Sequence, residues 1–233
     1  MPLPLSFFGS ASRRMLAGLS ACLLSLSPAV AENSPSLQAD LTKPLASPLW
    51  RFFETKWDIA PSPAGPILIS TAEADNSLLY SLNRSVQPPV EIDFEFLVYN
   101  NKTNANRFRI GFYSDTGGLA RKYEAEIIPG GPAKLYRLGG GMTELSKASD
   151  VITFPESTLS AQSPLAMHPV KGRLLFAKDH RLQLFIDGQL VLTSDRPVED
   201  PLNIFAISIW SRIFKGEPAN RVAFTKLSAT IAP

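Results

Sequence analysis

Three carboxylates alternate along one short segment of this 233-residue chain: Glu91, Asp93 and Glu95. In a β-strand successive side chains point to opposite faces, so these three would share one face while the apolar residues between them face a core. A row of carboxylates suits general acid/base chemistry, because like charges close together make one carboxyl hold its proton and donate it near neutral pH. The same row could also be an ordinary solvated sheet face, and the sequence leaves both interpretations open.

Aromatic and charged side chains alternate with apolar ones in two later segments. In residues 107–113 the alternation puts Arg109 and Tyr113 on the face opposite the apolar residues. In residues 204–210 it does the same for Trp210. Aromatic rings stack on the C–H faces of sugars, and planar charged groups hydrogen-bond sugar hydroxyls. We expect these three side chains to belong to a surface that binds a carbohydrate.

The loop after residue 99 favours an antiparallel hairpin between residues 91–99 and 107–113. In that hairpin Arg109 lies diagonally beside Glu95, within reach of an ion pair. The ion pair would favour the charged carboxylate, which argues against Glu95 as a proton donor. The pairing also joins the residues above into one predicted carbohydrate-binding site: Trp210, Tyr113, Arg109, Asp93 and Glu95.

Short β-like runs follow one another from Trp50 onward, and no helix-period stretch of useful length interrupts them. Asp187-Gly188 lies between two apolar runs and predicts a type I′ hairpin, because that turn needs positive φ. Residues 146–170 are the least regular part, and we expect a long loop there. About eleven strands in one domain predict an all-β fold, a two-sheet antiparallel sandwich. The expected strands are Ile67–Ser70, Leu78–Leu82, Glu91–Tyr99, Arg107–Tyr113, Lys122–Ile128, Ala133–Leu138, Arg173–Lys178, Arg181–Ile186, Leu190–Thr193, Ile204–Trp210 and Val222–Ile231.

The first 31 residues are typical of a secretory signal peptide. Arg13 and Arg14 precede an apolar run, Met15–Leu26, which is too short for a convincing membrane span. Ala29-Val30-Ala31 then forms a small-x-small cleavage site. We therefore expect an exported protein, periplasmic or secreted, that is cleaved after Ala31.

Cys22 offers a second interpretation of the leader, because Leu19-Ser20-Ala21-Cys22 resembles a bacterial lipoprotein box. The apolar run continues past Cys22, so lipid anchoring there is the less favoured alternative. After the leader, residues 32–48 are polar and contain three prolines, and we expect a tether. Residues 49–233 form the predicted sandwich domain.

Composition excludes several classes of function. The expected leader holds two of the 23 Lys and Arg residues and none of the 21 Asp and Glu residues, so the rest of the chain is balanced in charge. Balanced charge without a basic cluster argues against nucleic acid or an anionic membrane as a partner. The single cysteine lies in the leader, which excludes a cysteine nucleophile and a disulfide scaffold in the domain.

Metal ions and cofactors are not expected either. The chain has two histidines, too few to favour a zinc site. Asp115-Thr116-Gly117-Gly118 is a weak candidate for a structural calcium site, and a plain turn is the better interpretation. We expect a monomer without a cofactor, whose partner is a polysaccharide or another glycan.

Four strand-like segments resemble those of the concanavalin A-like lectin/glucanase superfamily: Lys122–Ile128, Ala133–Leu138, Leu182–Val191 and Val222–Leu227. The resemblance covers residues 50–231 and looks nearest to laminin-G-like and 3-keto-disaccharide hydrolase-type domains of secreted bacterial proteins. It consists of strand patterns and a turn, without catalytic signatures. The resemblance implies a jelly-roll sandwich with a concave, carbohydrate-facing sheet.

The segment Glu91–Leu97 is also similar to the E-x-D-x-E strand of lichenase and of xyloglucan-modifying enzymes on this fold. That similarity implies a retaining glycoside hydrolase with Glu91 as nucleophile, Glu95 as acid/base and Asp93 tuning both. Val98 departs from the pattern, because those enzymes usually carry a glycine there.

Three function hypotheses follow. The leading one is an exported carbohydrate-binding β-sandwich that acts on glycans outside the cytoplasm. The alternatives are the retaining hydrolase and a structural or protein-interaction domain. In the last case the concave face would be filled by the loop at 146–170.

Overall fold

The structure, a computed structural model, describes residues 36–38, 50–53, 57–62, 65–70, 75–99, 101, 106–116, 119–158, 167–198, 203–213 and 222–231. All of them belong to one unit, Asn33–Pro233, and their regular structure consists of β-strands. None of the described residues forms a helix that could span a membrane. The expected signal peptide, Cys22 and most of the expected tether lie outside this part of the chain.

The strands form two antiparallel sheets. The first, called the β6 sheet, contains β1 (Ser36–Gln38), β3 (Trp57–Ala60), β4 (Ile67–Ser70), β6 (Val90–Leu97), β12 (Val170–Phe176), β13 (Leu182–Ile186), β14 (Gln189–Thr193) and β16 (Ala223–Ile231). The second, called the β7 sheet, contains β2 (Trp50–Phe53), β5 (Asp75–Val86), β7 (Asn106–Thr116), β8 (Leu119–Ile127), β9 (Gly131–Leu138), β10 (Met142–Glu144), β11 (Val151–Ile152) and β15 (Ile204–Ile213).

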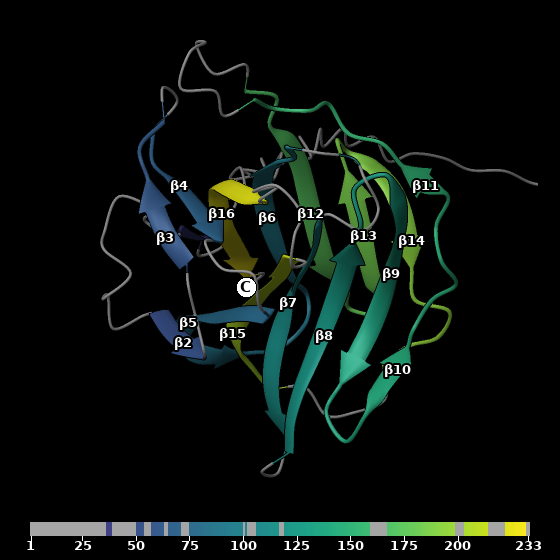
Figure 1. The fold of residues 1–233 in the computed structure, drawn as a ribbon. Coiled ribbons are helices and arrows are strands. Elements are labelled where there is room, and N and C mark those ends of the chain that lie inside the picture. The colour runs from purple at the N-terminus through teal and green to yellow at the C-terminus, as the bar shows by residue number, and fades with distance from the viewer. Residues whose placement is uncertain are drawn as a thin grey trace, which may run out of the picture. The chain divides into compact units, whose positions relative to one another are not determined.

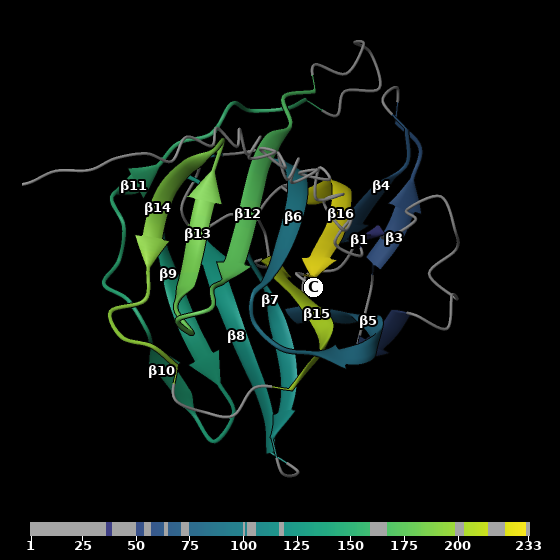
Figure 2. The same cartoon turned by 180° about the vertical axis from the view of Figure 1, so that it is seen from behind.

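The two sheets lie face to face. The strand order is β14-β13-β12-β6-β16-β4-β3 in the β6 sheet, with β1 beside β16. In the β7 sheet it is β10-β9-β8-β7-β15-β5-β2, with β11 beside β9. Strands β7 to β10 are nearest the viewer in Figure 1, and β12 to β14 are nearest in Figure 2. The predicted all-β, two-sheet antiparallel jelly-roll sandwich is confirmed.

Apolar residues at alternate strand positions fill the space between the sheets. Phe96 of β6 and Phe108 of β7 are fully buried, and their ring centroids lie 4.9 Å apart, so they join the two sheets. Phe224 of β16 stands edge-on to Phe108 at 5.5 Å. Burial of each such ring contributes about 1.5–3 kcal/mol.

The sequence predicts the positions of the longer strands correctly, but it predicts too few strands. Each of the eleven expected runs coincides with a strand to within a few residues. The hairpin at Asp187-Gly188 is confirmed, because φ is 47° at Asp187 and 79° at Gly188, the positive values that a type I′ turn needs. Five short strands were not expected: β1, β2, β3, β10 and β11. Of these, β1 lies within the segment expected to be a tether and pairs with β16.

The predicted hairpin between residues 91–99 and 107–113 is wrong. Strand β6 pairs with β12 and β16, whereas β7 pairs with β8 and β15. The chain therefore passes from one sheet to the other between these two strands. Both strands bury one face in the same core, so their alternation is identical whichever sheet they join.

The described part of the expected loop at 146–170 runs along the edge of the sandwich. Before β12 begins at Val170, the described part holds one strand, β11, which pairs with β9. Phe154 is buried in the core, and Asn101 holds it in place. Asn101 Oδ1 accepts a hydrogen bond from Phe154 N at 2.9 Å, and Asn101 Nδ2 donates to Phe154 O at 2.6 Å. This described part therefore contributes to the core.

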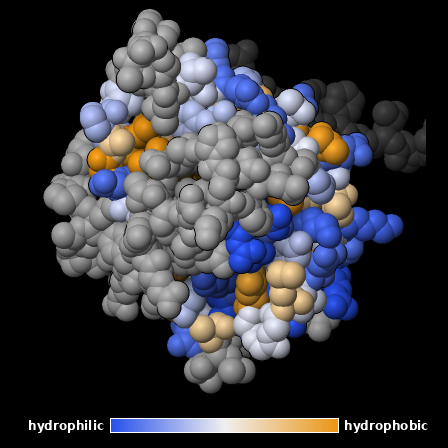
Figure 3. All heavy atoms as spheres, in the orientation of Figure 1, coloured by the Kyte–Doolittle hydropathy of each residue, from blue (hydrophilic) through white to orange (hydrophobic). Residues whose placement is uncertain are grey.

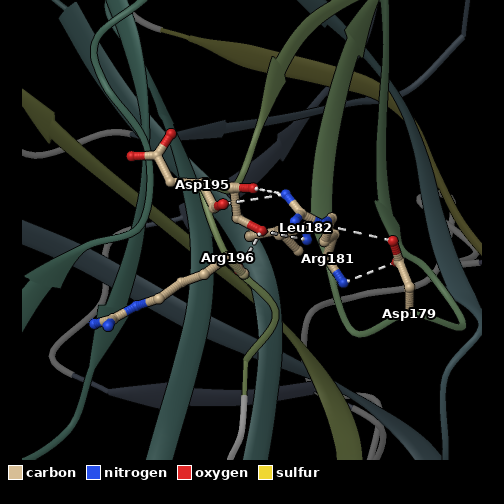
Figure 4. A network of polar contacts seen from close by, with 6 residues as sticks. Asp179, Arg181, Leu182, Asp195 and Arg196 are labelled. Atoms are coloured by element: carbon tan, nitrogen blue, oxygen red, sulfur yellow. Dashed lines mark hydrogen bonds and ion pairs between the residues drawn. The ribbon is translucent and has the colours of Figure 1, made fainter.

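A polar network closes the edge of the β6 sheet where β13 begins and β14 ends (Figure 4). Arg181 Nη1 donates to the carbonyl oxygens of Ser194 at 2.8 Å and Asp195 at 3.2 Å. Its Nε lies 3.7 Å from Asp179 Oδ2. Asp195 N donates to Leu145 O at 2.8 Å, so this corner is also attached to the segment that follows β10.

Candidate functional site

A buried ion pair lies between aromatic rings on the outer face of the β7 sheet. The alternation of β7 buries Phe108 and Ile110, so Arg109 points outward. Strand register sets Arg109 between Glu126 of β8 and Trp210 of β15. Arg109 Nε donates to Glu126 Oε2 at 2.8 Å, and Nη2 lies 2.7 Å from the same oxygen. The two side chains are only 16% and 6% exposed, so each charge depends on the other for its stabilisation.

Arg109 also stacks on two aromatic rings. Its Cζ lies 4.4 Å from the centroid of the Trp210 ring and 5.4 Å from that of Tyr136 on β9. A cation this close to a ring face is attracted by the ring quadrupole. Burial raises the pKa of Tyr136, and the charge of Glu126 raises it further, so the phenol keeps its proton. We call Arg109, Glu126, Tyr136 and Trp210 the Arg109 cluster.

A second polar contact crosses three strands beside the Arg109 cluster. Gly111 of β7 lies in register between Glu124 of β8 and Ser208 of β15. A Cβ at position 111 would come within 2.7 Å of Glu124 Cγ, so the missing side chain lets Glu124 lie across β7. Ser208 Oγ then donates to Glu124 Oε1 at 2.6 Å. Both residues are buried, and their contact fixes this part of the face.

The side of this face at β9 and β10 is charged and exposed. Lys134 Nζ lies 2.8 Å from Glu144 Oε1, and this hydrogen bond is the chief reason that the pKa of Lys134 is raised. Figure 3 shows the same side of the molecule, where hydrophilic residues gather over β8 to β10 with a few apolar ones among them. The described part of the face therefore combines aromatic rings with hydrogen-bonding groups of both charges.

Three of the five predicted carbohydrate-binding residues lie on this face. Trp210 and Arg109 are in contact, and Tyr113 lies further along β7. The Tyr113 ring stands edge-on to Phe205 at 4.9 Å. Alternation alone would place Phe205 in the core, but a β-bulge between Ile204 and Ala206 shifts the register. Phe205 is therefore half-buried beside Tyr113.

The other two predicted residues, Asp93 and Glu95, lie on the outer face of the β6 sheet. The core separates them from Trp210, Tyr113 and Arg109, so the structure does not bring the five together. The expected contact between Arg109 and Glu95 is wrong, because Arg109 pairs with a carboxylate of its own sheet. The physical reason is the crossing between β6 and β7 described above.

The carboxylates of β6 share one face, as their alternation predicts. Arg173 of β12 holds two of them: its Nε donates to Asp93 Oδ1 at 2.7 Å and lies 3.6 Å from Glu91 Oε2. The hydrogen bond to Asp93 is the chief reason that the pKa of Arg173 is raised. Glu95 lies in register between a lysine of β12 and a lysine of β16.

These contacts bear on the hydrolase hypothesis. Retaining hydrolysis needs two carboxyl groups about 5–5.5 Å apart, with one of them able to donate a proton. Here one guanidinium, that of Arg173, lies 2.7 Å from Asp93 and 3.6 Å from Glu91, so these two carboxylates share one cationic partner. Such contacts fit the other interpretation of the carboxylate row, an ordinary solvated sheet face, with Arg173 as the ion-pair partner that was expected to be Arg109. The roles implied for Glu91, Asp93 and Glu95 stay a hypothesis.

The sequence interpretation missed Glu126, Glu124, Tyr136 and Ser208 as members of the candidate site. A signal was present, because Glu124 and Glu126 alternate with apolar residues as the carboxylates of β6 do. It was not decisive, since only the strand order shows that β8 lies beside β7.

In the part of the chain that the structure describes, no three or more His, Cys, Asp or Glu residues form a group that could hold a metal ion. The weak calcium candidate, the turn at 115–118, lies partly outside that part.

Comparison with known proteins supports the fold. No family model matches the chain, and no curated protein is significantly similar to it. Among solved structures, the carbohydrate recognition domain of Emp47p aligns with a TM-score of 0.59 and 11% identity, over 85% of this chain and 95% of that domain. The carbohydrate-binding module CBM66 from Bacillus subtilis aligns with a TM-score of 0.52 and 13% identity, over 78% of this chain and 95% of the module. A Bacillus subtilis protein with a galectin-like fold aligns with a TM-score of 0.55 and 9% identity, over 78% of this chain and 89% of that one. The chain thus has the two-sheet fold of these galectin-like and carbohydrate-binding sandwiches.

Proposed function

We propose that the protein binds a carbohydrate on the outer face of the β7 sheet, with Trp210 as the stacking platform. The observation that carries the proposal is the Arg109 cluster. Arg109 is fixed by Glu126 and lies against the Trp210 ring, so the ring is oriented before a ligand arrives. An ordered side chain loses little conformational entropy on binding, which favours affinity.

The chemistry around Trp210 suits a ligand rich in hydroxyl groups. Tyr136 supplies a protonated phenol, and the exposed pair of Lys134 and Glu144 supplies a donor and an acceptor nearby. Sugar-binding surfaces need an aromatic ring for the apolar face of the pyranose and polar groups for its hydroxyls. The Emp47p domain is a carbohydrate recognition domain and CBM66 is a carbohydrate-binding module, and both share this fold, which supports the proposal.

The expected signal peptide places this binding outside the cytoplasm. The finer resemblance to laminin-G-like and 3-keto-disaccharide hydrolase-type domains stays a hypothesis beside it. A monomer is enough for the proposed site, because all members of the Arg109 cluster come from one chain.

The test is glycan binding by paired variants. The protein is titrated by calorimetry with mixed-linkage β-glucan, laminarin and xyloglucan, after a screen on a wider glycan array. We expect Trp210→Ala to weaken the affinity for a recognised neutral glycan at least about tenfold, which corresponds to about 1.4 kcal/mol of binding free energy. Val151→Ala is the control. Val151 is an exposed apolar residue of β11 that belongs to neither the Arg109 cluster nor the face of the other sheet, and its loss leaves that affinity unchanged.

Other results would contradict the proposal. Equal affinity of Trp210→Ala and the unaltered protein would remove the site from this face. Release of reducing ends that is lost in Glu91→Gln would favour the hydrolase hypothesis. Failure to bind any glycan would favour a structural or protein-interaction domain.

A further inference from the structure

A pocket of about 340 Å³ lies on the outer face of the β6 sheet, on the opposite side from the Arg109 cluster. Its lining residues come from β6, β12, β13 and the β13–β14 turn, which lie side by side in Figure 2: Asp93, Lys171, Gly172, Arg173, Phe185 and Gly188. Pockets that hold small molecules begin at about 300 Å³, so this one is large enough for a single sugar residue.

The β13–β14 turn is fixed against β12 and forms one wall of the pocket. Lys171 N donates to Asp187 Oδ1 at 2.9 Å, and Asp187 N donates to Lys171 O at 2.7 Å. The type I′ geometry of the turn then sets Gly188 at the rim. The wall is therefore preformed by one backbone hydrogen bond and one hydrogen bond to the Asp187 side chain.

Arg173 is held by Asp93 through its Nε atom. Asp93 accepts a hydrogen bond from its Nε, which fixes the plane of the guanidinium, while the side chain stays 49% exposed. Among the described residues, nothing accepts a hydrogen bond from Arg173 Nη1 or Nη2, and nothing donates to the second carboxylate oxygen of Asp93. Arg173 thus offers a two-pronged donor beside an unused acceptor.

Lys171 and Phe185 complete the chemistry of the pocket. Lys171 is exposed and has no ion-pair partner within 4.0 Å among the described residues. Phe185 is the cross-strand neighbour of Arg173 and is half-buried on the same face. The lining carries two positive charges, on Lys171 and Arg173, and one negative charge, on Asp93, and the carboxylate of Glu91 lies 3.6 Å from Arg173.

From these contacts we infer that the pocket binds a sugar residue that carries a carboxylate, that is, a uronic acid. The carboxylate takes the paired Nη donors of Arg173, a geometry in which arginine binds carboxylates bidentately, and Lys171 adds a second charge. Phe185 supplies the surface for the pyranose ring, and the free oxygen of Asp93 accepts from a hydroxyl. A dianion such as phosphate would be repelled by Asp93 and Glu91. This site goes beyond the proposed function, which concerns the opposite sheet.

The test compares four probes by chemical-shift titration of backbone amides in the protein. The probes are methyl α-D-galacturonate, the matched neutral methyl α-D-galactoside, acetate and inorganic phosphate. We expect saturable chemical-shift changes at the amides of Lys171, Gly172 and Gly188 with the galacturonate. Each of the other three probes should bind at least about tenfold more weakly, a difference of about 1.4 kcal/mol in binding free energy.

Variants locate the site and separate it from the first proposal. Lys171→Met and Phe185→Leu keep the Arg173–Asp93 contact, and each weakens galacturonate binding several-fold. Arg173→Gln weakens galacturonate binding at least about tenfold. Arg173→Lys binds little better than Arg173→Gln, because an ammonium lacks the paired donors of the guanidinium. Trp210→Ala leaves galacturonate binding unchanged, although it weakens binding of the neutral glycan on the β7 sheet.

The inference is overturned by any of three results. Acetate or phosphate binding as strongly as galacturonate would show a site for charge alone. Galactoside binding as strongly would show that the carboxylate is not recognised. Unchanged galacturonate binding in both Lys171→Met and Phe185→Leu, with spectra that show folded protein, would move the ligand elsewhere.

Discussion

Two arginine–carboxylate pairs differ in burial, and this difference sets what each can do. Arg109 and Glu126 are almost enclosed, whereas Arg173 is 49% exposed and its partner Asp93 is 29% exposed. Breaking an enclosed pair leaves a charge without water or partner, while an exposed pair is screened. Under the two proposals above, Arg109 would position Trp210 on its face and Arg173 would contact a ligand on the other.

The enclosed pair leads to a prediction about stability. Arg109→Leu leaves Glu126 unpaired, and we expect a loss of about 3 kcal/mol in the free energy of unfolding. The double variant Arg109→Leu/Glu126→Leu recovers much of this loss, because it leaves no buried charge. Lys134→Ala, which breaks the exposed pair with Glu144, is the control and leaves the urea midpoint unchanged. A double variant no more stable than Arg109→Leu would show that the pair itself is not the cause.

Tyr99 leads to a prediction about alkaline pH. Its hydroxyl is buried and has no hydrogen-bond partner among the described residues, and burial raises its pKa from 10 to about 12. The unfolded chain therefore loses this proton at a lower pH than the folded one. The resulting contribution to stability is complete below pH 10 and is lost as the pH rises towards about 12.

Tyr99→Phe removes this titration. At neutral pH we expect the variant to be at least as stable as the unaltered protein, because an unpaired buried hydroxyl is lost. Between about pH 10 and pH 12 the free energy of unfolding should fall less steeply in the variant. Urea unfolding at several pH values measures both effects. Parallel pH profiles would show that Tyr99 ionises freely in the folded state.

At the scale of elements, Asn101 strengthens the contact between two segments that share only an isolated β-bridge, between Val98 and Glu156. Its side chain makes both a donor and an acceptor contact with the backbone of Phe154, and its own N donates to Glu156 Oε1 at 2.8 Å. These contacts hold the segment after β11 in the place where Phe154 enters the core. The segment has little regular structure, so it depends on such contacts.

Asn101→Ala tests this dependence. The change leaves both backbone groups of Phe154 without a partner, and we expect a loss of about 1–3 kcal/mol in the free energy of unfolding. Thr153→Ala, an exposed change in the same segment, is the control and should have little effect. Hydrogen exchange at the Phe154 amide should rise in Asn101→Ala alone. Unchanged protection there would show that β11 holds the segment without Asn101.

At the scale of the whole molecule, the sequence predicts which side chains face out but not which sheet they face out from. Alternation correctly predicts that Arg109 and Tyr113 share one face and that Glu91, Asp93 and Glu95 share one face. Each β-strand of a sandwich turns its apolar side to the same core, however, so period-2 patterns from the two sheets look alike. Sheet membership depends on where the chain crosses the core.

The candidate site was therefore predicted in part. Trp210 and Arg109 came from the types of side chain on their strands, and the structure places them in contact. Glu126 and Tyr136 could not be found in this way, because they reach Arg109 through the order of β7, β8 and β9. The pocket beside Arg173 likewise depends on β12 lying next to β6, strands that are separated by more than seventy residues of sequence.

The Arg109 cluster and the Arg173 pocket lie on opposite outer faces of the sandwich, with the aromatic core between them. A ligand that lies along one face cannot also occupy the other without passing around the edge of the sandwich. Engagement of both faces would give each molecule a valency of two for different glycans, one neutral and one acidic. The protein would then crosslink separate polysaccharide chains as a monomer, and the network would dissolve when an excess of either free sugar is added.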